Sequence, residues 1–193
     1  MDATVGLRER KKAETRQAVH EATLRLAVEL GLDNVTVEAI ADAANISRRT
    51  FSNYFDSKED ALLYGDERRL GELVQHVRDQ PAQLSAWRAL RGALECLFDE
   101  DGSPDRDWLI RTKLAKRHPS LLARQLASRV RLETQLTQAL AGRAAGGVAA
   151  EVITAAFLAG LRVATQRWIA DGETRTLREI TDQVLDQIAQ PFG

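Results

Sequence analysis

Two short helical segments joined by a tight turn are the most constraining feature of this 193-residue chain. After Thr36, which suits a helix N-cap, apolar residues recur at helical spacing until Asn45 interrupts them. Asn adopts a left-handed backbone more readily than most residues, so it fits a tight turn. Ser47 then caps a second short segment, in which Phe51 and Phe55 stand four residues apart. With a further helix predicted over 8–30, these segments predict a helix-turn-helix arrangement.

The rest of the chain also has helical periodicity. Aromatic residues make up only 5% of the sequence and there are four prolines, which favours helices over sheets. We therefore predict an all-α fold of about nine helices, in which a three-helix module over 1–56 precedes a larger helical body over 57–193. Helices of the body are predicted at 57–80, 83–99, from Ser103-Pro104 onward, 119–142, 148–171 and 174–190, with a loop at 142–147 and a break at Gly172.

Charge is balanced, so any binding to nucleic acid must be local. The net charge is −1, and residues 1–65 hold nine Lys and Arg against eleven Asp and Glu. The charges must therefore be segregated by face. No acid occurs between Ser47 and Phe55, and the outer face of that segment is predicted to present Arg48, Arg49, Thr50, Ser52, Asn53 and Tyr54.

These residue types have the chemistry that reads DNA. Arg binds guanine edges in bidentate fashion, Asn binds adenine, and Ser or Tyr binds phosphate oxygens. Lys58 is predicted in the first turn of the next helix, where helix N-termini favour anions, and Arg10, Lys11, Lys12 and Arg16 could add backbone contacts. Two adjacent arginines are more often a solvated surface, and the two phenylalanines are core residues. The significance therefore lies in the ordered set.

The ordered set resembles the TetR family of bacterial regulators. The resemblance covers about residues 8–65 and rests on Thr36-Val37-Glu38-Ala39-Ile40-Ala41, Ala44-Asn45-Ile46-Ser47, Arg49-Thr50-Phe51, Tyr54-Phe55 and Ser57-Lys58-Glu59. It implies a homodimer that grips a palindromic operator and leaves it when a small molecule binds the helical body. It also implies DNA contacts by Thr36, Arg48, Arg49, Thr50, Asn53, Tyr54 and Lys58. The chain departs from the family pattern at Ser52, where an aromatic is usual, and at Asn45, where Gly is usual.

A narrower similarity concerns the body. We call the three-helix module over 1–56 the head. Residues 114–124 and Trp168, taken with the motifs of the head, are similar to mycofactocin-type regulators, whose C-terminal domain is associated with acyl-CoA-like ligands. This implies a lipophilic or acyl-CoA-like effector. Aromatic candidates for a pocket are Trp87, Phe98, Trp108 and Phe157, with Arg111 or Arg129 to hold a polar ligand group. For each of these residues, an ordinary core or surface role is at least as reasonable.

The last two predicted helices have the pattern of a dimer interface. Ala156, Gly160 and Ala164 form a stripe of small residues, and Leu177, Ile180 and Val184 form a second apolar stripe. Two such helices from each of two chains would build a four-helix bundle. Burial of both stripes within one chain is the alternative.

Several classes of function lack support in the sequence. Cys96 has no disulfide partner, the three histidines are isolated, and no nucleophile or phosphate-loop motif is present, so we expect no metal, no cofactor and no enzyme. With no long apolar run and no apolar signal core at the charged N-terminus, we expect a cytoplasmic protein that does not bind membranes. The main alternative is a helical small-molecule-binding protein whose head no longer reads DNA, and Ser52 is its only support. An all-helical enzyme is a third possibility, with no visible catalytic set.

Overall fold

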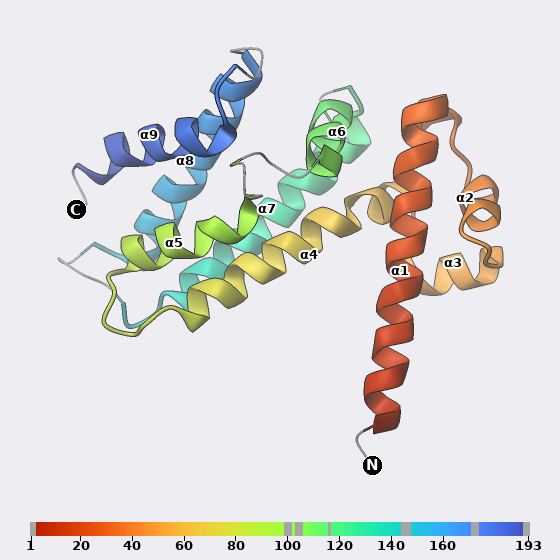
Figure 1. The fold of residues 1–193 in the computed structure, drawn as a ribbon, viewed down its shortest axis with the longest axis horizontal. Helices are drawn as coiled ribbons and strands as arrows, with labels where there is room; N and C mark the ends of the chain where they lie inside the picture. The colour runs from red at the N-terminus through yellow and green to blue at the C-terminus, as the bar shows by residue number, and fades with distance from the viewer. Residues whose placement is uncertain are drawn as a thin grey trace. The chain divides into compact units, whose positions relative to one another are not determined.

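The computed structural model describes residues 3–98, 102, 106–115, 117–143, 148–170 and 174–190. Over these residues it contains helices and no strand, which confirms the all-α prediction (Figure 1). The nine α-helices of the described chain are α1 (Ala3–Leu30), α2 (Val37–Ala43), α3 (Arg48–Tyr54), α4 (Lys58–Asp79), α5 (Ala86–Leu94), α6 (Arg106–Ala115), α7 (Pro119–Ala139), α8 (Ala150–Ala170) and α9 (Leu177–Ala189). Short 3₁₀ helices follow α1 at Leu32–Asn34 and α5 at Glu95–Leu97.

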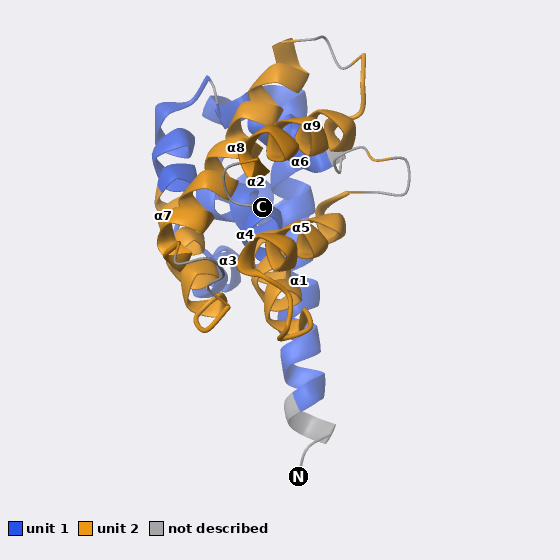
Figure 2. Cartoon of the chain, turned by 90° about the vertical axis from the view of Figure 1, so that its left-hand side faces the viewer, with its two compact units in different colours: residues 1–68, 106–126 blue, residues 69–105, 127–193 orange. Residues whose placement is uncertain are grey.

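The chain divides into two compact units, shown in different colours in Figure 2. Unit 1 comprises residues 1–68 and 106–126, and unit 2 comprises residues 69–105 and 127–193. Helices α4 and α7 each contribute residues to both units, and α6 belongs to unit 1. The boundary predicted after residue 56 therefore falls inside unit 1.

The turns around α2 and α3 form as the sequence predicts. The Thr36 hydroxyl oxygen accepts a hydrogen bond from the Ala39 amide at 3.1 Å, and the Ser47 hydroxyl oxygen accepts one from the Thr50 amide at 3.0 Å. Between them, Asn45 has φ of 54°, the left-handed conformation expected of the turn. Each cap satisfies an amide that the first turn of a helix leaves without a partner.

Other helix ends differ from the sequence-based expectation. Helix α1 begins at Ala3, five residues earlier than predicted, and α5 begins only after its cap, Ser85. In a capping box, the carboxylate three residues after the cap accepts a hydrogen bond from the backbone amide of the cap residue. Asp60 has a shorter side chain than Glu, and its carboxylate accepts a hydrogen bond from the Ser57 hydroxyl instead. A full capping box occurs at α9 instead, between Thr176 and Glu179. Ser103-Pro104, Gly172 and most of the loop at 142–147 lie outside the described residues.

The apolar core of unit 1 holds α3 in place. Phe51 is 1% exposed and Phe55 8%, and their ring centroids are 5.8 Å apart. The Phe55 ring meets Tyr64 of α4 edge-on, at 5.7 Å between centroids. Buried residues of α1, including Val19 and Leu24, belong to the same core cluster. The short helices α2 and α3 are therefore fixed by burial of one face, since segments of this length are unstable alone.

A buried polar cluster adds directional contacts to this core. The Arg111 side chain of α6 is 1% exposed, and its Nε and Nη2 atoms lie 2.8 and 2.7 Å from Oδ1 of Asp66 on α4. Its Nη1 is 3.4 Å from Nε2 of His20 on α1, and Nδ1 of that ring is 2.9 Å from the carbonyl oxygen of Ala61. The cluster thus joins three helices that are distant in sequence.

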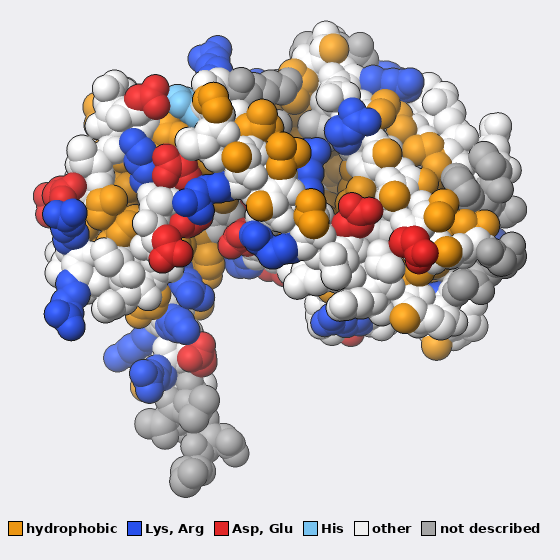
Figure 3. All heavy atoms as spheres, turned by 180° about the vertical axis from the view of Figure 1, so that it is seen from behind, with side chains coloured by type: hydrophobic (Ala, Val, Ile, Leu, Met, Phe, Trp, Pro, Cys, Tyr) orange, Lys and Arg blue, Asp and Glu red, His pale blue; other side chains and the backbone are white. Residues whose placement is uncertain are grey.

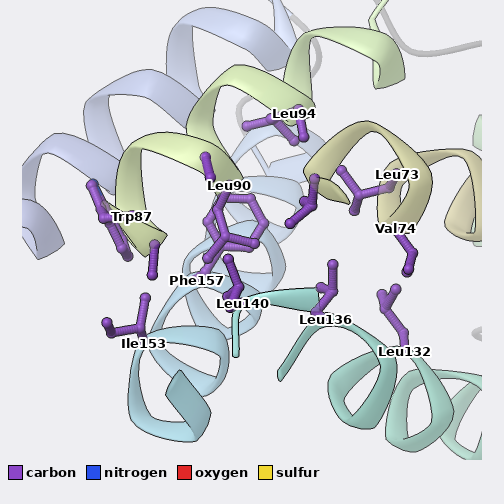
Figure 4. Close-up of a cluster of buried hydrophobic side chains, with 14 of the residues drawn as sticks. Leu73, Val74, Trp87, Leu90, Leu94, Leu132, Leu136, Leu140, Ile153 and Phe157 are labelled. Atoms are coloured by element: carbon purple, nitrogen blue, oxygen red, sulfur yellow. The ribbon is translucent and has the colours of Figure 1, made fainter. Parts of the chain in front are cut away.

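Unit 2 has its own apolar core, which Figure 4 shows around Phe157 of α8. Phe157 is fully buried and meets the Trp87 ring edge-on, at 6.1 Å between centroids. Further members come from α4, α5, α7, α8 and the residue that follows α7, among them Leu73, Val74, Leu90, Leu94, Leu132, Leu136, Leu140 and Ile153. None of the helices within the described residues is both long enough and apolar enough to cross a membrane.

Two glycines of α4 give a matched test of the polar cluster. A Cβ added at Gly65 would be 2.8 Å from Nε2 of His20 and 3.3 Å from Nη1 of Arg111, whereas one added at Gly71 would meet nothing within 4 Å. We expect Gly65→Ala to lower the free energy of unfolding by about 1–3 kcal/mol, as overpacking does. Gly71→Ala should raise it by about 0.5–1 kcal/mol, because alanine loses less backbone entropy in a helix. Urea unfolding measures both, and a stabilised Gly65→Ala variant would contradict the close packing.

Candidate nucleic-acid interface

Helix α3 separates a buried face from an exposed one. Phe51 lies in the core, while the side chains of Arg48, Arg49, Ser52 and Asn53 are exposed. Thr50 and Tyr54, also predicted to face outward, are half-buried. The exposed side therefore offers two guanidinium groups, an amide and a hydroxyl, which can donate to phosphate oxygens and to base edges.

Some predicted contact residues already have partners inside the head. The hydroxyls of Thr50 and Ser47 are 2.8 Å apart, and the Thr36 hydroxyl caps α2. These hydroxyls hold the two helix starts in position. Their contact with DNA stays a prediction, whereas their role in the turn is visible.

Arg48 forms an ion pair that the sequence did not reveal. Its Nη1 atom is 2.9 Å from Oε1 of Glu38 on α2, and both side chains are largely exposed, at 72% and 56%. The acid-free stretch from Ser47 to Phe55 therefore has a carboxylate beside it from the preceding helix. Exposed ion pairs contribute little free energy, so a phosphate oxygen can replace this carboxylate at small cost.

Lys58 makes contacts that differ from the predicted phosphate contact. Its ammonium donates to the carbonyl oxygens of Leu32 at 2.8 Å, Val35 at 2.9 Å and Asp33 at 3.4 Å. An ammonium has three N–H donors, and all three point to the turn between α1 and α2. In this structure Lys58 joins the start of α4 to that turn.

Arg16 is a site residue that sequence reasoning placed only among general backbone contacts. Its guanidinium carbon is 5.8 Å from the ring centroid of Tyr54, the last residue of α3, and 6.0 Å from that of Tyr64. A guanidinium at this distance attracts the face of an aromatic ring. Arg16 therefore orients the end of α3 against α1, a contact that only the fold brings together.

The pocket candidates belong to two different units. Trp87 and Phe157 pack in the core of unit 2, where Phe98 is half-buried. Trp108 is half-buried and, like Arg111, belongs to unit 1. Arg111 was expected to hold a ligand group, but its guanidinium is buried on Asp66, and a contact of Arg111 with a ligand stays a prediction.

Arg129 remains a candidate for a polar ligand contact. Its side chain is exposed, yet partial burial lowers the pKa of its guanidinium, and the positive charge of Arg162 on α8 lowers it further. Two guanidinium groups that repel each other favour an anion between them.

The half-buried Cys96 has a raised pKa because of burial and, secondarily, the charge of Glu72, so its thiol is not activated.

The two stripes predicted at a dimer interface pack within one chain. A Cβ added at Gly160 of α8 would be 2.7 Å from Cδ2 of Leu185 and 2.9 Å from Cδ1 of Ile188, both on α9. The other members, apart from the half-buried Ala156, are buried: Ala164, Leu177, Ile180 and Val184. The small-residue stripe therefore permits close approach of α9 of the same protomer, and a role of these residues at an interface with a second chain stays a prediction.

The described residues hold no group of three or more His, Cys, Asp or Glu that could bind a metal ion.

With its exposed α3, capped turn and buried phenylalanines, the head of this chain is a helix-turn-helix DNA-binding module.

Comparison with known proteins gives a narrower classification. Residues 20–64 match the family described as bacterial regulatory proteins, tetR family, and residues 84–193 match the MftR C-terminal domain. The HTH-type transcriptional regulator TcmR of Streptomyces glaucescens is 30% identical, over 95% of this chain and 86% of its own length. The chain therefore belongs to the TetR family of regulators, in the subgroup with an MftR-like C-terminal domain.

Solved structures share the fold. The FadR repressor of Thermus thermophilus, in complex with lauroyl-CoA, is 22% identical with a TM-score of 0.55, over 91% of this chain and 93% of that one. The FadR regulator of Bacillus subtilis, in complex with stearoyl-CoA, is 19% identical with a TM-score of 0.61, over 90% and 97%. The first of these is described as a TetR family transcriptional repressor, so its similarity in fold agrees with the family assignment of this chain.

The His20 ring gives the head a pH dependence. Burial lowers the pKa of His20 from its usual 6.5, the hydrogen bond to Ala61 raises it, the charge of Arg111 lowers it, and Asp66 and Asp107 raise it. The Tyr64 ring packs edge-on against it. Below pH 6.5 the unfolded chain therefore binds a proton that the folded chain resists, so folding stability falls as pH falls.

We expect thermal stability to decrease from pH 7.5 to 5.5, a range above the usual titration of carboxylates. His20→Asn should show a smaller decrease, because asparagine can donate to Ala61 but does not titrate. Melting temperatures of both proteins at four pH values provide the measurement. Equal decreases in the two would mean that His20 does not cause the effect.

Proposed function

We propose that this chain is a ligand-responsive transcription repressor of the cytoplasm, which binds a palindromic operator as a homodimer and leaves it when a small lipophilic or acyl-CoA-like effector binds. The observation that carries the proposal is the exposed face of α3, held outward by the buried Phe51 and Phe55. Arg49 and Asn53 on this face have the chemistry for guanine and adenine edges. Family membership supports the same function.

A dimer is part of the proposal because one half-site offers too few contacts for a specific site in a genome. Gly160 and its neighbours are covered by α9, so the partner would meet another face of α8. Val152 is 48% exposed, and Ala155 and Ala159 are exposed one and two turns further along α8. Small side chains on an exposed apolar strip allow two such helices to approach closely.

The proposed effector class rests on the body. Its match to the MftR C-terminal domain and its fold similarity to two proteins in complex with acyl-CoA support a ligand with an acyl chain and anionic groups. Trp87, Phe98 and Phe157 are the proposed apolar contacts, and Arg129 is the proposed polar one. Its neighbour Arg162 would add a second cation for phosphate or carboxylate groups.

Reading of the operator is tested with Arg49→Ala. We expect it to weaken operator binding by about 1–3 kcal/mol if the guanidinium binds a base edge, and to relax the preference for operator over unrelated duplex. Arg25→Ala removes an exposed charge from α1 and should bind as wild type does. Mobility shifts with the DNA upstream of the protein's own gene measure the affinity of the wild-type protein and of both variants. Sedimentation of the same proteins should give the mass of two chains. Wild-type protein without any operator preference would favour the alternative of a small-molecule-binding protein.

The switch predicts reciprocal binding. Helix α4 runs as one helix from Lys58 to Asp79, about 33 Å at 1.5 Å per residue, and contributes to both cores. We propose that the effector favours a state in which the spacing of the two heads does not fit the operator. The effector must then bind the DNA-free protein more tightly than the operator complex, and bound operator must weaken effector binding by the same factor by which the effector weakens operator binding. Calorimetric titration of acyl-CoA thioesters into free protein and into the protein–operator complex measures that factor. Equal affinities would exclude the switch even if the thioester binds.

A further inference from the structure

The first half of α1, over residues 6–18, contributes no buried residue to the core of its unit. Of residues 6–18, none has a buried side chain, and the first buried residue of the helix is Val19. At 1.5 Å per residue, the part from Ala3 to Ala18 extends for about 24 Å. Figure 1 shows this part of α1 extending beyond α3 toward the N-terminus. We call residues 6–18 the arm.

Charges on the arm are sorted by face. With 3.6 residues per turn, Arg8, Lys11, Lys12 and Arg16 fall within an arc of about 140° that contains no acid. Arg10, also predicted from the sequence to contact the DNA backbone, points away from this arc and pairs with Glu14, at 3.4 Å between Nε and Oε1, so we leave it out of the basic face. Figure 3 shows Lys and Arg side chains gathered along the projecting helix. The arm is thus a helix with one basic face, and the charges are segregated as the balanced composition requires.

The direction of the basic face is set by Arg16. Its guanidinium lies over the ring of Tyr54 at the end of α3, so this side of α1 faces α3. Lys12 and Arg8 are four and eight residues before Arg16, which places them on the same side about 6 and 12 Å further along the axis. The arm therefore continues the surface that α3 presents.

We propose that Arg8, Lys11 and Lys12 bind the phosphate backbone beside the major groove that α3 enters. The inference rests on the proposed DNA-binding function and extends the interface beyond the helix-turn-helix. An α-helix with side chains is about 10 Å or more across and the minor groove only about 6 Å wide, so the arm lies along phosphates and does not enter that groove. Cations that contact only phosphates bind any sequence alike.

The test compares two double variants that remove the same charge. Arg8→Ala/Lys12→Ala removes two cations from the basic face, and Arg10→Ala/Arg25→Ala removes two from the other side of α1. All four side chains are exposed or half-buried, so both doubles should melt as wild type does. Affinities for the operator and for an unrelated duplex are measured at four salt concentrations between 50 and 300 mM.

For Arg8→Ala/Lys12→Ala we expect the slope of log affinity against log salt to fall by about two for each arm on the DNA, about one per phosphate contact. Affinity should drop by the same factor for both duplexes, so operator preference is retained. Arg10→Ala/Arg25→Ala should keep the wild-type slope. An unchanged slope in Arg8→Ala/Lys12→Ala, or an equal fall of the slope in both double variants, would overturn the proposed phosphate contacts of the arm. In that case an operator preference of the wild-type protein would still uphold the proposed function. Wild type that binds no DNA overturns both.

Discussion

The buried ion pair between Arg111 and Asp66 is the contact on which the geometry of unit 1 most depends. Removing two charges from water is costly, and the cost is offset only when their remaining donors and acceptors are satisfied. Here His20 accepts beside Nη1 of the guanidinium and in turn bonds to the Ala61 carbonyl, so α6, α4 and α1 are joined at one point, while Nη2 has the ion-pair contact with Asp66 and no hydrogen bond. Gly65 leaves the space for this arrangement. Loss of one partner would leave an uncompensated buried charge, which makes the relative position of the three helices specific as well as stable.

That position determines what the head can present. Because α1 is fixed by the cluster and by the apolar core, Arg16 meets Tyr54 and sets the end of α3, while Lys58 joins the turn after α1 to the start of α4. The Thr36 and Ser47 hydroxyls and the Lys58 ammonium therefore form hydrogen bonds with backbone groups of the turns. The exposed residues of α3, with Arg49 and Asn53 foremost, and the basic face of the arm are left to meet an external anion. Apart from Arg16, the side chains that hold the backbone therefore differ from those that we propose for recognition.

The sequence predicted what depends on near neighbours. The caps at Thr36 and Ser47, the left-handed Asn45 and the two faces of α3 all follow from contacts within four residues. It could not predict contacts between distant residues: Arg111 bonds to Asp66, 45 positions away, and looked like a pocket residue. The stripe around Gly160 was ambiguous for another reason. Helical periodicity shows that a face is buried, but it is the same whether the covering helix belongs to the same chain or to a second one.

Helix α4 connects these arguments to a response. Its first half holds Asp66 in the polar cluster, and its second half holds Leu73 and Val74 in the core of unit 2. Packed cores deform by switching between discrete arrangements and not by gradual bending. A ligand bound among the residues of unit 2 can therefore influence the head by favouring a different packing of α4, one of the two helices, with α7, that contribute to both units. The charged cluster resists any packing that separates Arg111 from Asp66, so α1 and α6 should move with the first half of α4 as one body. The coupling that an effector achieves is then limited by its difference in affinity between the two packings of the second half.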